Sequence, residues 1–402
     1  MEIYGGKMRN FFKRLCAVGL IVALVFTTTG CGKKVQFNTV GISFGNYING
    51  ASVAYQNNIT YYIKDGDIYK TEDMTDKGRK IVEGDLSSLN VAGEKVYFYN
   101  KEISTICKCN TEGDLVERIA EVYCDNFIIN KDNIFASILT GQGSDDLKDP
   151  DNYNVSALKT TNKKVTNQKQ GNVIEKAKLV GSFGDYLYVE KKDHKTKKIG
   201  LYMVSLTGEE VVKMMDLPDN ANVIVKGNNI YVLGQANGKY GLHVFDGKGK
   251  LLKTVATTME NPIINTNALN TDGNYIYFED YAKKTEVVKT EKVKKVRVKK
   301  AKNGHKAKYK KKTIVETTKK KVAYDNIVRI SIEDIESFIA GDLKKAPEKE
   351  VVYKGKNPVS EFQLAKGANA MLVKERKAKK NVEPSAWIED WKVIEKSVVS
   401  ED

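Results

Sequence analysis

Short runs of apolar and aromatic residues recur along the chain, and each follows a turn of Gly, Asn or Asp. Examples are Ile59-Thr60-Tyr61-Tyr62, Val96-Tyr97-Phe98-Tyr99 and Ile230-Tyr231-Val232. β-Branched and aromatic residues fit the pleated surface of a strand, whereas Gly, Asn and Asp favour tight turns. Convincing helical periodicity is scarce, and its best stretch is 332–343. The pattern therefore predicts an all-β fold.

The runs repeat at a regular spacing, which can be measured on one aliphatic residue in each copy. These anchor residues are Ile59, Val96, Ile134, Leu187, Ile230, Ile276 and Ala370. They are 37, 38, 53, 43, 46 and 94 residues apart. The first five intervals match a propeller-blade period of about 40 to 50 residues. A second strand follows the anchors, as at 67–70, 103–106 and 201–204, so each copy predicts an antiparallel meander.

A single meander cannot bury both of its faces, so the copies must pack around an axis or along a stack. A closed ring also protects the edges of the sheets. The turn-Ile-Tyr repeats resemble the β-propeller repeats, related to those of lipoprotein-receptor ectodomains, of uncharacterised Gram-positive surface lipoproteins. The resemblance covers residues 47–400 and implies about seven blades, with six or eight as alternatives. Unrelated hairpins in a pair of β-sandwiches are a second interpretation.

Two segments are expected to complete the ring. Residues 386–394, which contain Trp387 and Trp391, have the composition of the last strands. Residues 40–43 (Val-Gly-Ile-Ser) are expected to add the strand that seals the ring.

Residues 1–31 have the three parts of an export signal peptide. Arg9, Lys13 and Arg14 give a positive start, residues 15–26 form a twelve-residue apolar core, and small residues follow at 27–31. The core is shorter than the about 20 residues that a membrane-spanning helix needs. Residues 32–34 (Gly-Lys-Lys) are polar and flexible, and residues 32–46 are expected to form a tether. Met8 is an alternative start of translation.

The pair Gly30-Cys31 resembles the lipobox of bacterial lipoproteins, although Thr28 stands where that family usually has Leu. The resemblance implies that Cys31 becomes the new N-terminus and carries lipid, such as palmitate. The protein is then expected on the extracellular face of the cytoplasmic membrane. An ordinary secretory signal with an incidental cysteine is the alternative.

The formal net charge of +15 arises from one segment of the chain. Residues 283–321 contain 18 Lys or Arg and three acidic residues, which is a net +15 by itself. Asn303-Gly304 is a strong signal for a two-residue hairpin turn. Pairing around that turn is expected to place Val293 opposite Ile314 and Val298 opposite Tyr309. The segment therefore predicts a long basic β-hairpin inserted in the propeller.

The same pairing sets cations opposite each other. The expected pairs are Lys295 with Lys312, Arg297 with Lys310, and Lys299 with Lys308. Because like charges opposite each other destabilise a ladder, we expect the hairpin to be ordered by a polyanion. The residues expected to bind it are Lys292, Lys294, Lys295, Arg297, Lys299, Lys300, Lys302, Lys306, Lys308, Lys310, Lys311 and Lys312.

Several partners fit this charge. An anionic envelope polymer such as teichoic acid and anionic lipid headgroups are the leading candidates, and another envelope protein is a further one. Nucleic acid would attract the same cations through its phosphates, but it is a less expected partner for an exported protein. A solvated charged loop without a dedicated partner is the alternative.

Residue types that carry catalysis are sparse. The chain has three histidines, His194, His243 and His305, and none belongs to a recognisable motif. No cofactor is expected, and no metal site is predicted; the acidic stretch 144–152 could hold calcium but is better explained as a solvated turn. Cys107, Cys109 and Cys124 leave open packed thiols, one disulfide to Cys124, or metal ligation.

The sequence thus favours a non-enzymatic, lipid-anchored surface propeller that binds or scaffolds an envelope ligand. An extracellular hydrolase acting on glycans is the alternative, and it predicts clustered carboxylates at one mouth of the central channel. A solute-binding transport lipoprotein is disfavoured because it would alternate strands with helices.

Overall fold

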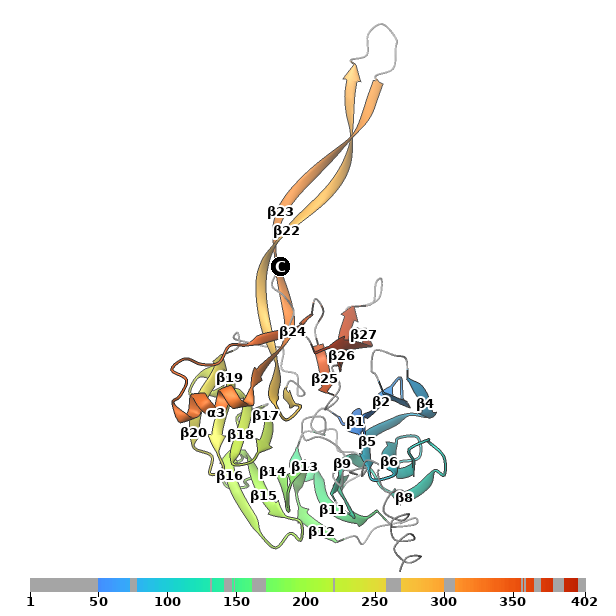
Figure 1. Cartoon of the computed structure of the whole chain (residues 1–402), viewed down its shortest axis with the longest axis vertical. Coiled ribbons are helices and arrows are strands. Elements are labelled where there is room, and N and C mark those ends of the chain that lie inside the picture. Colours follow the sequence, from blue (N-terminus) through green and yellow to red (C-terminus); the bar gives the residue numbers. More distant parts are fainter. Residues whose placement is uncertain are drawn as a thin grey trace, which may run out of the picture. The chain divides into compact units, whose positions relative to one another are not determined.

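The computed structural model describes residues 50–396 without 73–77, 131, 141–146, 148, 161–170, 220, 258–268, 300–307, 356, 358, 365–369 and 379–386. Seven antiparallel sheets follow one another along the described chain (Figure 1). Six of them have four strands and the last has three, and hydrogen-bonded neighbours are always consecutive in sequence. Each sheet is therefore a simple meander, as the repeat predicted.

The strands of each sheet are called A to D in chain order. Sheets 1 and 2 contain β1 (Val53–Gln56), β2 (Ile59–Lys64), β3 (Asp67–Thr71), β4 (Arg79–Val82), β5 (Leu86–Ala92), β6 (Lys95–Asn100), β7 (Thr105–Asn110) and β8 (Glu117–Glu121). Sheets 3 and 4 contain β9 (Cys124–Asn130), β10 (Asn133–Leu139), β11 (Tyr153–Lys159), β12 (Asn172–Glu175), β13 (Ala177–Phe183), β14 (Tyr186–Lys192), β15 (Ile199–Ser205) and β16 (Val211–Asp216).

The remaining sheets include the longest strands. Sheets 5 and 6 contain β17 (Asn222–Lys226), β18 (Asn229–Ala236), β19 (Lys239–Asp246), β20 (Leu251–Thr257), β21 (Leu269–Thr271), β22 (Tyr275–Lys299), β23 (Lys308–Ser331) and β24 (Glu350–Gly355). Sheet 7 contains β25 (Val359–Leu364), β26 (Ala370–Ala378) and β27 (Trp387–Glu395). The expected strand at 103–106 begins two residues later than predicted, because residues 101–104 form the preceding turn.

Both faces of every sheet are buried against a neighbouring sheet. In β9 and β10, for example, Phe127 and Ile134 pack against sheet 2, whereas Ile128 and Phe135 pack against sheet 4. Side chains alternate between the faces of a strand, so a strand with apolar residues on both faces belongs between two sheets. One apolar cluster fills each of the six interfaces between consecutive sheets.

A seventh cluster joins the last sheet to the first and closes the ring. Val53 and Tyr62 of sheet 1 pack there against Ala370 and Leu372 of sheet 7. The amide N–H of Ser52 also donates to Oε1 of Gln363 in β25, at 2.6 Å. Seven sheets with seven packed interfaces define a β-propeller of seven blades, which confirms the predicted fold class and blade number.

The first strands of neighbouring blades contact one another, so strand A of each blade lies nearest the axis. In a four-stranded meander, the A–B and C–D connections lie on one side of the ring. The B–C and D–A connections lie on the other side, which we call the B–C side. The chain enters strand A of blade 1 from Gly50, so the described part begins on the B–C side.

Hydrogen bonds join alternate pairs of blades at their A–B turns. The last residue of strand A in blade 1, Gln56, donates through Nε2 to the carbonyl oxygen of Gly93 at 2.5 Å. Asn130 donates through Nδ2 to that of Gly184 at 3.1 Å, and Nζ of Lys226 donates to that of Gly273. The three glycines occupy equivalent turns of blades 2, 4 and 6. These bonds join blades 1 with 2, 3 with 4, and 5 with 6.

The predicted helical stretch is helix α3 (Ile332–Ala340), which lies between strands C and D of blade 6. Ser331 caps its N-terminus, and Gly341 ends it in a left-handed conformation with φ of 93°. Its buried residues Ile332 and Ile335 join the cluster between blades 5 and 6. Across the described ranges, helices are too short and too polar to cross a membrane.

Candidate functional site

The most distinctive feature is the pair of long strands in blade 6. The ladder of β22 and β23 runs from Tyr275 paired with Ser331 to Lys299 paired with Lys308 (Figure 1). Strand β24 pairs with β23 only at residues 325–329, so the two long strands continue beyond the blade by themselves. The predicted basic hairpin is therefore an elongation of the central strand pair of blade 6. We call residues 283–321 the arm.

The register of the arm differs by one residue from the prediction over most of its length. The observed pairs are Val293 with Thr313, Lys295 with Lys311, and Arg297 with Tyr309, in place of Ile314, Lys312 and Lys310. The predicted pair of Val298 with Tyr309 is likewise wrong, whereas Lys299 does pair with Lys308. The prediction counted outward from the turn, but the blade sets the register from the other end. An irregularity between Arg297 and Lys299 absorbs the difference.

Like-charged partners persist in the observed register. Lys294 pairs with Lys312, and Lys295 pairs with Lys311. The side chains of Lys310 and Lys311 are exposed. Of the twelve residues predicted to bind a polyanion, nine lie in the two strands. The others, Lys300, Lys302 and Lys306, fall outside the described residues.

The positive charge is concentrated at the far end of the arm. Residues 292–312 hold twelve Lys or Arg and no acidic residue, a net charge of +12. The remainder, 283–291 and 313–321, holds six Lys and three Glu, a net charge of +3. The distal residues 292–312 thus carry most of the charge of the arm.

The root of the arm is acidic and partly buried. Oδ2 of Asp325 accepts a hydrogen bond from the amide of Val359, the first residue of β25, at 2.9 Å. Burial raises the pKa of Asp325 to about 6, the hydrogen bond from Val359 opposes the rise, and nearby Asp280 adds to it. Nζ of Lys349 lies 2.6 Å from Oδ2 of Asp280. The arm is thereby fixed to both blade 6 and blade 7 where it begins.

A buried carboxylate lies at the same interface between blades 6 and 7. Glu375 in β26 is 1% exposed and accepts hydrogen bonds from the hydroxyl of Tyr353 and, at 2.9 Å, from Nδ2 of Asn357. Nζ of Lys392 lies 2.6 Å from its Oε2. Burial acts to raise the pKa of Glu375, but its bonds to Lys392, Tyr353 and Asn357 hold that pKa below its usual value. Glu375 is therefore an ionised structural group.

A polar groove of about 700 Å³ opens on the B–C side of blades 4 and 5. Ile199, Leu217 and Pro218 form its apolar part. Its polar lining consists of Asp149, Lys192, Lys197, Lys198, Asp216, Asp219 and Gln235. The three lysines balance the three aspartates, and Lys192 already pairs with Asp149, so the groove is polar and has little net charge.

Two carboxylates on this side of blades 3 and 4, Asp125 and Asp149, are paired with lysines, whereas burial raises the pKa of a third carboxyl group, Glu190 in β14. Nζ of Lys178 lies 3.0 Å from Oδ2 of Asp125. Nζ of Lys192 lies 2.9 Å from Oδ2 of Asp149, and this bond holds the pKa of Asp149 below its usual value. A glycosidase needs one carboxyl group kept protonated beside a second, ionised one. Asp125 and Asp149 do not form such a pair.

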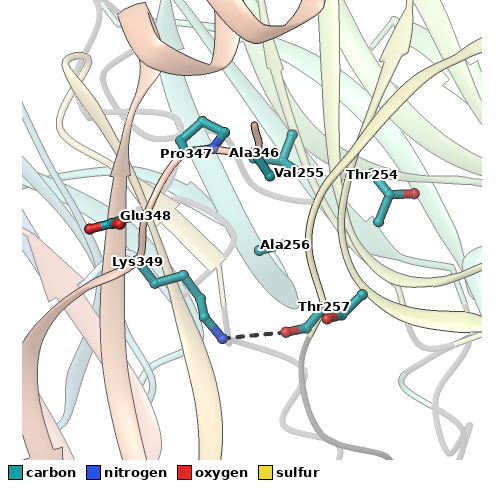
Figure 2. Close-up of a pocket in the computed structure, with 8 residues that line it drawn as sticks. All are labelled: Thr254, Val255, Ala256, Thr257, Ala346, Pro347, Glu348 and Lys349. Atoms are coloured by element: carbon teal, nitrogen blue, oxygen red, sulfur yellow. Dashed lines mark hydrogen bonds between the residues drawn. The ribbon is translucent and has the colours of Figure 1, made fainter. Parts of the chain in front are cut away.

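A second hollow, of about 550 Å³, lies between β20 and the segment that follows α3 (Figure 2). It is lined by Thr254, Val255, Ala256, Thr257, Ala346, Pro347, Glu348 and Lys349. Lys349 supplies the amine in this hollow, and its Nζ already donates to the carbonyl oxygen of Thr257 at 3.3 Å and to Asp280. Most other lining side chains are small and supply few groups that could bind a ligand or take part in catalysis.

The three described cysteines are free and buried, which agrees with the packed-thiol interpretation. Burial raises the pKa of Cys107 to about 11 and that of Cys109 to about 12. The pKa of Cys124 is also raised by burial. All three therefore remain protonated and unreactive at neutral pH. The described residues contain no group of three or more His, Cys, Asp or Glu side chains placed to hold a metal ion.

The described histidines have structural surroundings. Nε2 of His243 lies 3.1 Å from the carbonyl oxygens of Gly234 and Lys239, and Nδ1 lies 3.0 Å from Oγ1 of Thr254. Burial lowers the pKa of His243, which favours the neutral ring. His194 lies on the surface, with Nε2 3.8 Å from Oδ1 of Asp151.

Other sequence-based predictions fall outside the described residues. These are the lipid attachment at Cys31, the sealing strand at 40–43, and His305 at the arm's turn. Sequence reasoning also missed the polar groove and the Glu375 cluster. Both are assembled from segments far apart in the chain, so no local sequence pattern predicts either of them.

No protein-family model matches the chain, and no curated protein matches its sequence. Among solved structures, it is similar to a putative TolB from Agrobacterium tumefaciens, at 9% identity over 69% of this chain and 86% of that one, with a TM-score of 0.38. It is also similar to an oligogalacturonate lyase in complex with manganese, at 13% identity over 56% and 71%, with a TM-score of 0.37. A third likeness is to the tricorn protease, at 10% identity over 86% and 36%, with a TM-score of 0.33.

These likenesses concern the fold alone. The described chain is a seven-bladed β-propeller with a basic hairpin arm, and this assignment rests on its own seven sheets and seven packed interfaces.

Proposed function

We propose that this protein is exported, anchored by lipid at Cys31 on the outer face of the cytoplasmic membrane, and used there as a non-catalytic binding scaffold. The propeller is the rigid body of the scaffold, and the arm is its contact with a polyanion of the envelope. The observation that carries the proposal is the concentration of twelve Lys or Arg without an acidic residue at 292–312.

The ladder of the arm supports a binding role over a passive charged loop. Cations that pair across the ladder, such as Lys294 with Lys312, oppose its formation in the absence of counter-charge. A bound polyanion removes that repulsion and releases its own condensed counterions, which makes the binding strong at low salt and weak at high salt. The two long strands give this charge a fixed origin in blade 6.

The test compares the full chain with a variant in which residues 283–321 are replaced by Asn-Gly. Both proteins are bound to isolated envelope material, and retention is measured as salt is raised. We expect the wild type to be retained at moderate salt and the variant to lose most of that retention. The variant should keep the cooperative thermal unfolding of the propeller, because the replacement removes no residue of the seven apolar clusters. Equal retention of two folded proteins would contradict the binding role of the arm.

The anchor has its own test. Mass spectrometry of the N-terminal peptide from cell-derived protein should show acylated Cys31 and no residue before it. Cys31→Ser should release the protein from the membrane fraction. A peptide that begins elsewhere, with an unmodified cysteine, would contradict lipid anchoring.

A further inference from the structure

The polar groove of blades 4 and 5 is built from segments of three blades. Asp149 reaches it from the B–C connection of blade 3, and Lys197 and Lys198 belong to the B–C turn of blade 4. Leu217 lies in the link between blades 4 and 5, and Gln235 lies in strand B of blade 5. The volume of about 700 Å³ is within the range of pockets that bind small molecules. The groove therefore has the size of a ligand site, and the ring holds its lining in place.

Two of the three aspartates in the lining are already neutralised. Oδ2 of Asp149 lies 2.9 Å from Nζ of Lys192. Oδ1 of Asp216 lies 2.7 Å from Nζ of Lys213, a residue that is not part of the lining. These two carboxylates are therefore not available to neutralise the remaining lysines of the groove.

The other charged groups of the lining have no such partners. Within the described chain, the ammonium groups of Lys197 and Lys198 and the carboxylate of Asp219 form no ion pair or hydrogen bond. Because Lys197 and Lys198 are adjacent, both amines can reach one anionic group, as charge-assisted donors. The carboxylate of Asp219 can accept hydrogen bonds from hydroxyl groups. A ligand with one anionic group and several hydroxyl groups would therefore satisfy all three side chains.

The turn that carries the two lysines is fixed by its own hydrogen bonds. Oδ1 of Asp193 accepts the amide N–H groups of Lys195 and Thr196, at 2.9 and 3.2 Å. The N–H of Lys197 donates to the carbonyl oxygen of Asp193 at 2.7 Å, and the N–H of Asp193 donates to that of Lys198 at 2.8 Å. Lys197 has a left-handed backbone with φ of 61°, where glycine would fit with less strain. A lysine in this conformation points to a role for its side chain.

We propose that this groove binds a hydroxylated organic anion of monosaccharide size, such as a sugar phosphate or a uronate. Lys197 and Lys198 bind the phosphate or carboxylate group, and Asp219 accepts hydrogen bonds from the hydroxyl groups. The amide of Gln235 can donate to or accept from a further hydroxyl group. The apolar side chain of Ile199 packs against the C–H groups of the sugar. The site depends on neither the arm nor the lipid anchor, so it adds a second binding function to the scaffold.

The test measures the reactivity of individual lysines in the full chain. Lysines are acetylated with a water-soluble reagent, with and without glucose 6-phosphate, and each is quantified by mass spectrometry. We expect Lys197 and Lys198 to react about fivefold more slowly when the probe is at about four times its Kd. Lys195, which lies in the same turn but not in the lining, should react at the same rate throughout. Detection residue by residue separates the groove from the arm, which also attracts anions.

Three related probes test the chemistry of the ligand. Glucuronate carries a carboxylate in place of the phosphate, and protection by it or by glucose 6-phosphate supports the inference. The stronger of the two identifies the preferred anionic group. Glucose lacks the anion and inorganic phosphate lacks the sugar, so each should protect only weakly at the same concentration. Equal protection by inorganic phosphate and glucose 6-phosphate would overturn the sugar-binding part of the inference.

Two double variants with the same change in charge give the matched control. Binding is followed by hydrogen exchange of the backbone amides in 216–219, which should slow when glucose 6-phosphate is added. Lys197→Gln with Lys198→Gln should lose this effect. Lys64→Gln with Lys195→Gln should keep it, because Lys64 is an exposed residue of blade 1 and Lys195 lies outside the lining. Both variants should unfold cooperatively at the wild-type temperature, because all four side chains are exposed.

Two outcomes would overturn the inference. In the first, Lys195, Lys197 and Lys198 are protected equally, which is the general attraction of anions to exposed lysines. In the second, neither glucose 6-phosphate nor glucuronate protects Lys197 and Lys198. Both outcomes leave the retention of the protein on envelope material unchanged, so they are distinguishable from a failure of the proposed function.

Discussion

At the scale of single residues, the buried carboxylates at the root of the arm are in two different states. Glu375 is surrounded by three donors, including Lys392, and these bonds lower its pKa despite its burial. Burial raises the pKa of Asp325 to about 6, because its single backbone donor does not offset the burial and the carboxylate of Asp280 adds to the rise. Two acids of similar intrinsic strength therefore differ because of the donors that surround them. Glu375 stabilises the fold as an anion, whereas ionised Asp325 costs free energy.

This difference predicts a pH dependence for Asp325→Asn. A raised pKa in the folded state means that the folded protein binds the proton more tightly than the unfolded chain does. The stability of the wild type should therefore fall as pH rises from about 4 through 6, relative to a variant that does not ionise. The amide oxygen introduced by the substitution can still accept the bond from Val359. We expect the variant to be more stable by about 2–3 kcal/mol at pH 7.5 and unchanged at pH 3.5.

The measurement is urea unfolding of both proteins across this pH range. Asp246→Asn serves as the control, because the pKa of Asp246 is lowered by its backbone donors and its pH dependence should have the opposite sign. A constant difference between Asp325→Asn and the wild type at every pH would refute the assignment.

At the scale of elements, the register of the arm's ladder places like charges opposite each other. Its inner end is fixed by the apolar pairs of blade 6, such as Ile276 with Ile330. Its outer part pairs Lys294 with Lys312 and Lys295 with Lys311. Cross-strand pairs of like charge are unfavourable by a few tenths of a kcal/mol each. The outer ladder should therefore open more often than the inner ladder.

Reversing one side of the outer pairs should stabilise the ladder. In the variant with Lys311→Glu and Lys312→Glu, both positions pair with lysine, so we expect backbone amides in 293–313 to exchange hydrogen several-fold more slowly. Hydrogen exchange measured by mass spectrometry at low salt checks this prediction. The matched control is Lys320→Glu, which places Glu opposite Glu286 and should speed exchange there. Faster exchange in the first variant would show that the register does not govern the stability of the arm.

The elements also show what the sequence could predict. The turn-Ile-Tyr repeat located strand B of every blade, because each such strand contains apolar residues buried on both faces. The arm was found for a similar local reason, its charge and its Asn303-Gly304 signal. Its register was missed by one residue because the blade, rather than the turn, fixes the pairing. The bonds of Asn130 and Glu375 were missed because their partners come from other strands or blades.

At the scale of the whole molecule, the ring is held by packing at seven interfaces and by polar bonds that differ between them. Interfaces 1/2, 3/4 and 5/6 have the bond from the end of strand A to the next A–B turn. Other interfaces use other bonds, such as Asn270 Nδ2 to the carbonyl oxygen of Phe362 between blades 6 and 7, at 3.3 Å. An odd number of blades cannot be divided entirely into such pairs.

The bond between blades 3 and 4 can be tested through Asn130. Its Nδ2 donates to Oγ of Ser182 at 2.7 Å as well as to Gly184, and the side chain is buried. Asn130→Ala leaves these acceptors unsatisfied, so we expect a loss of about 1–3 kcal/mol in unfolding free energy. Denaturant titration measures the loss. Asn133→Ala, which removes an exposed contact with Lys159, should change stability by less than about 0.5 kcal/mol.

The position of the polar groove has a consequence for the stability of the ring. Its lining comes from blade 4, which supplies Lys197 and Ile199, and from blade 5, which supplies Gln235. A small ligand held there would touch both blades at once. Its binding free energy would add to the stability of the folded ring, because the unfolded chain has no groove to bind it.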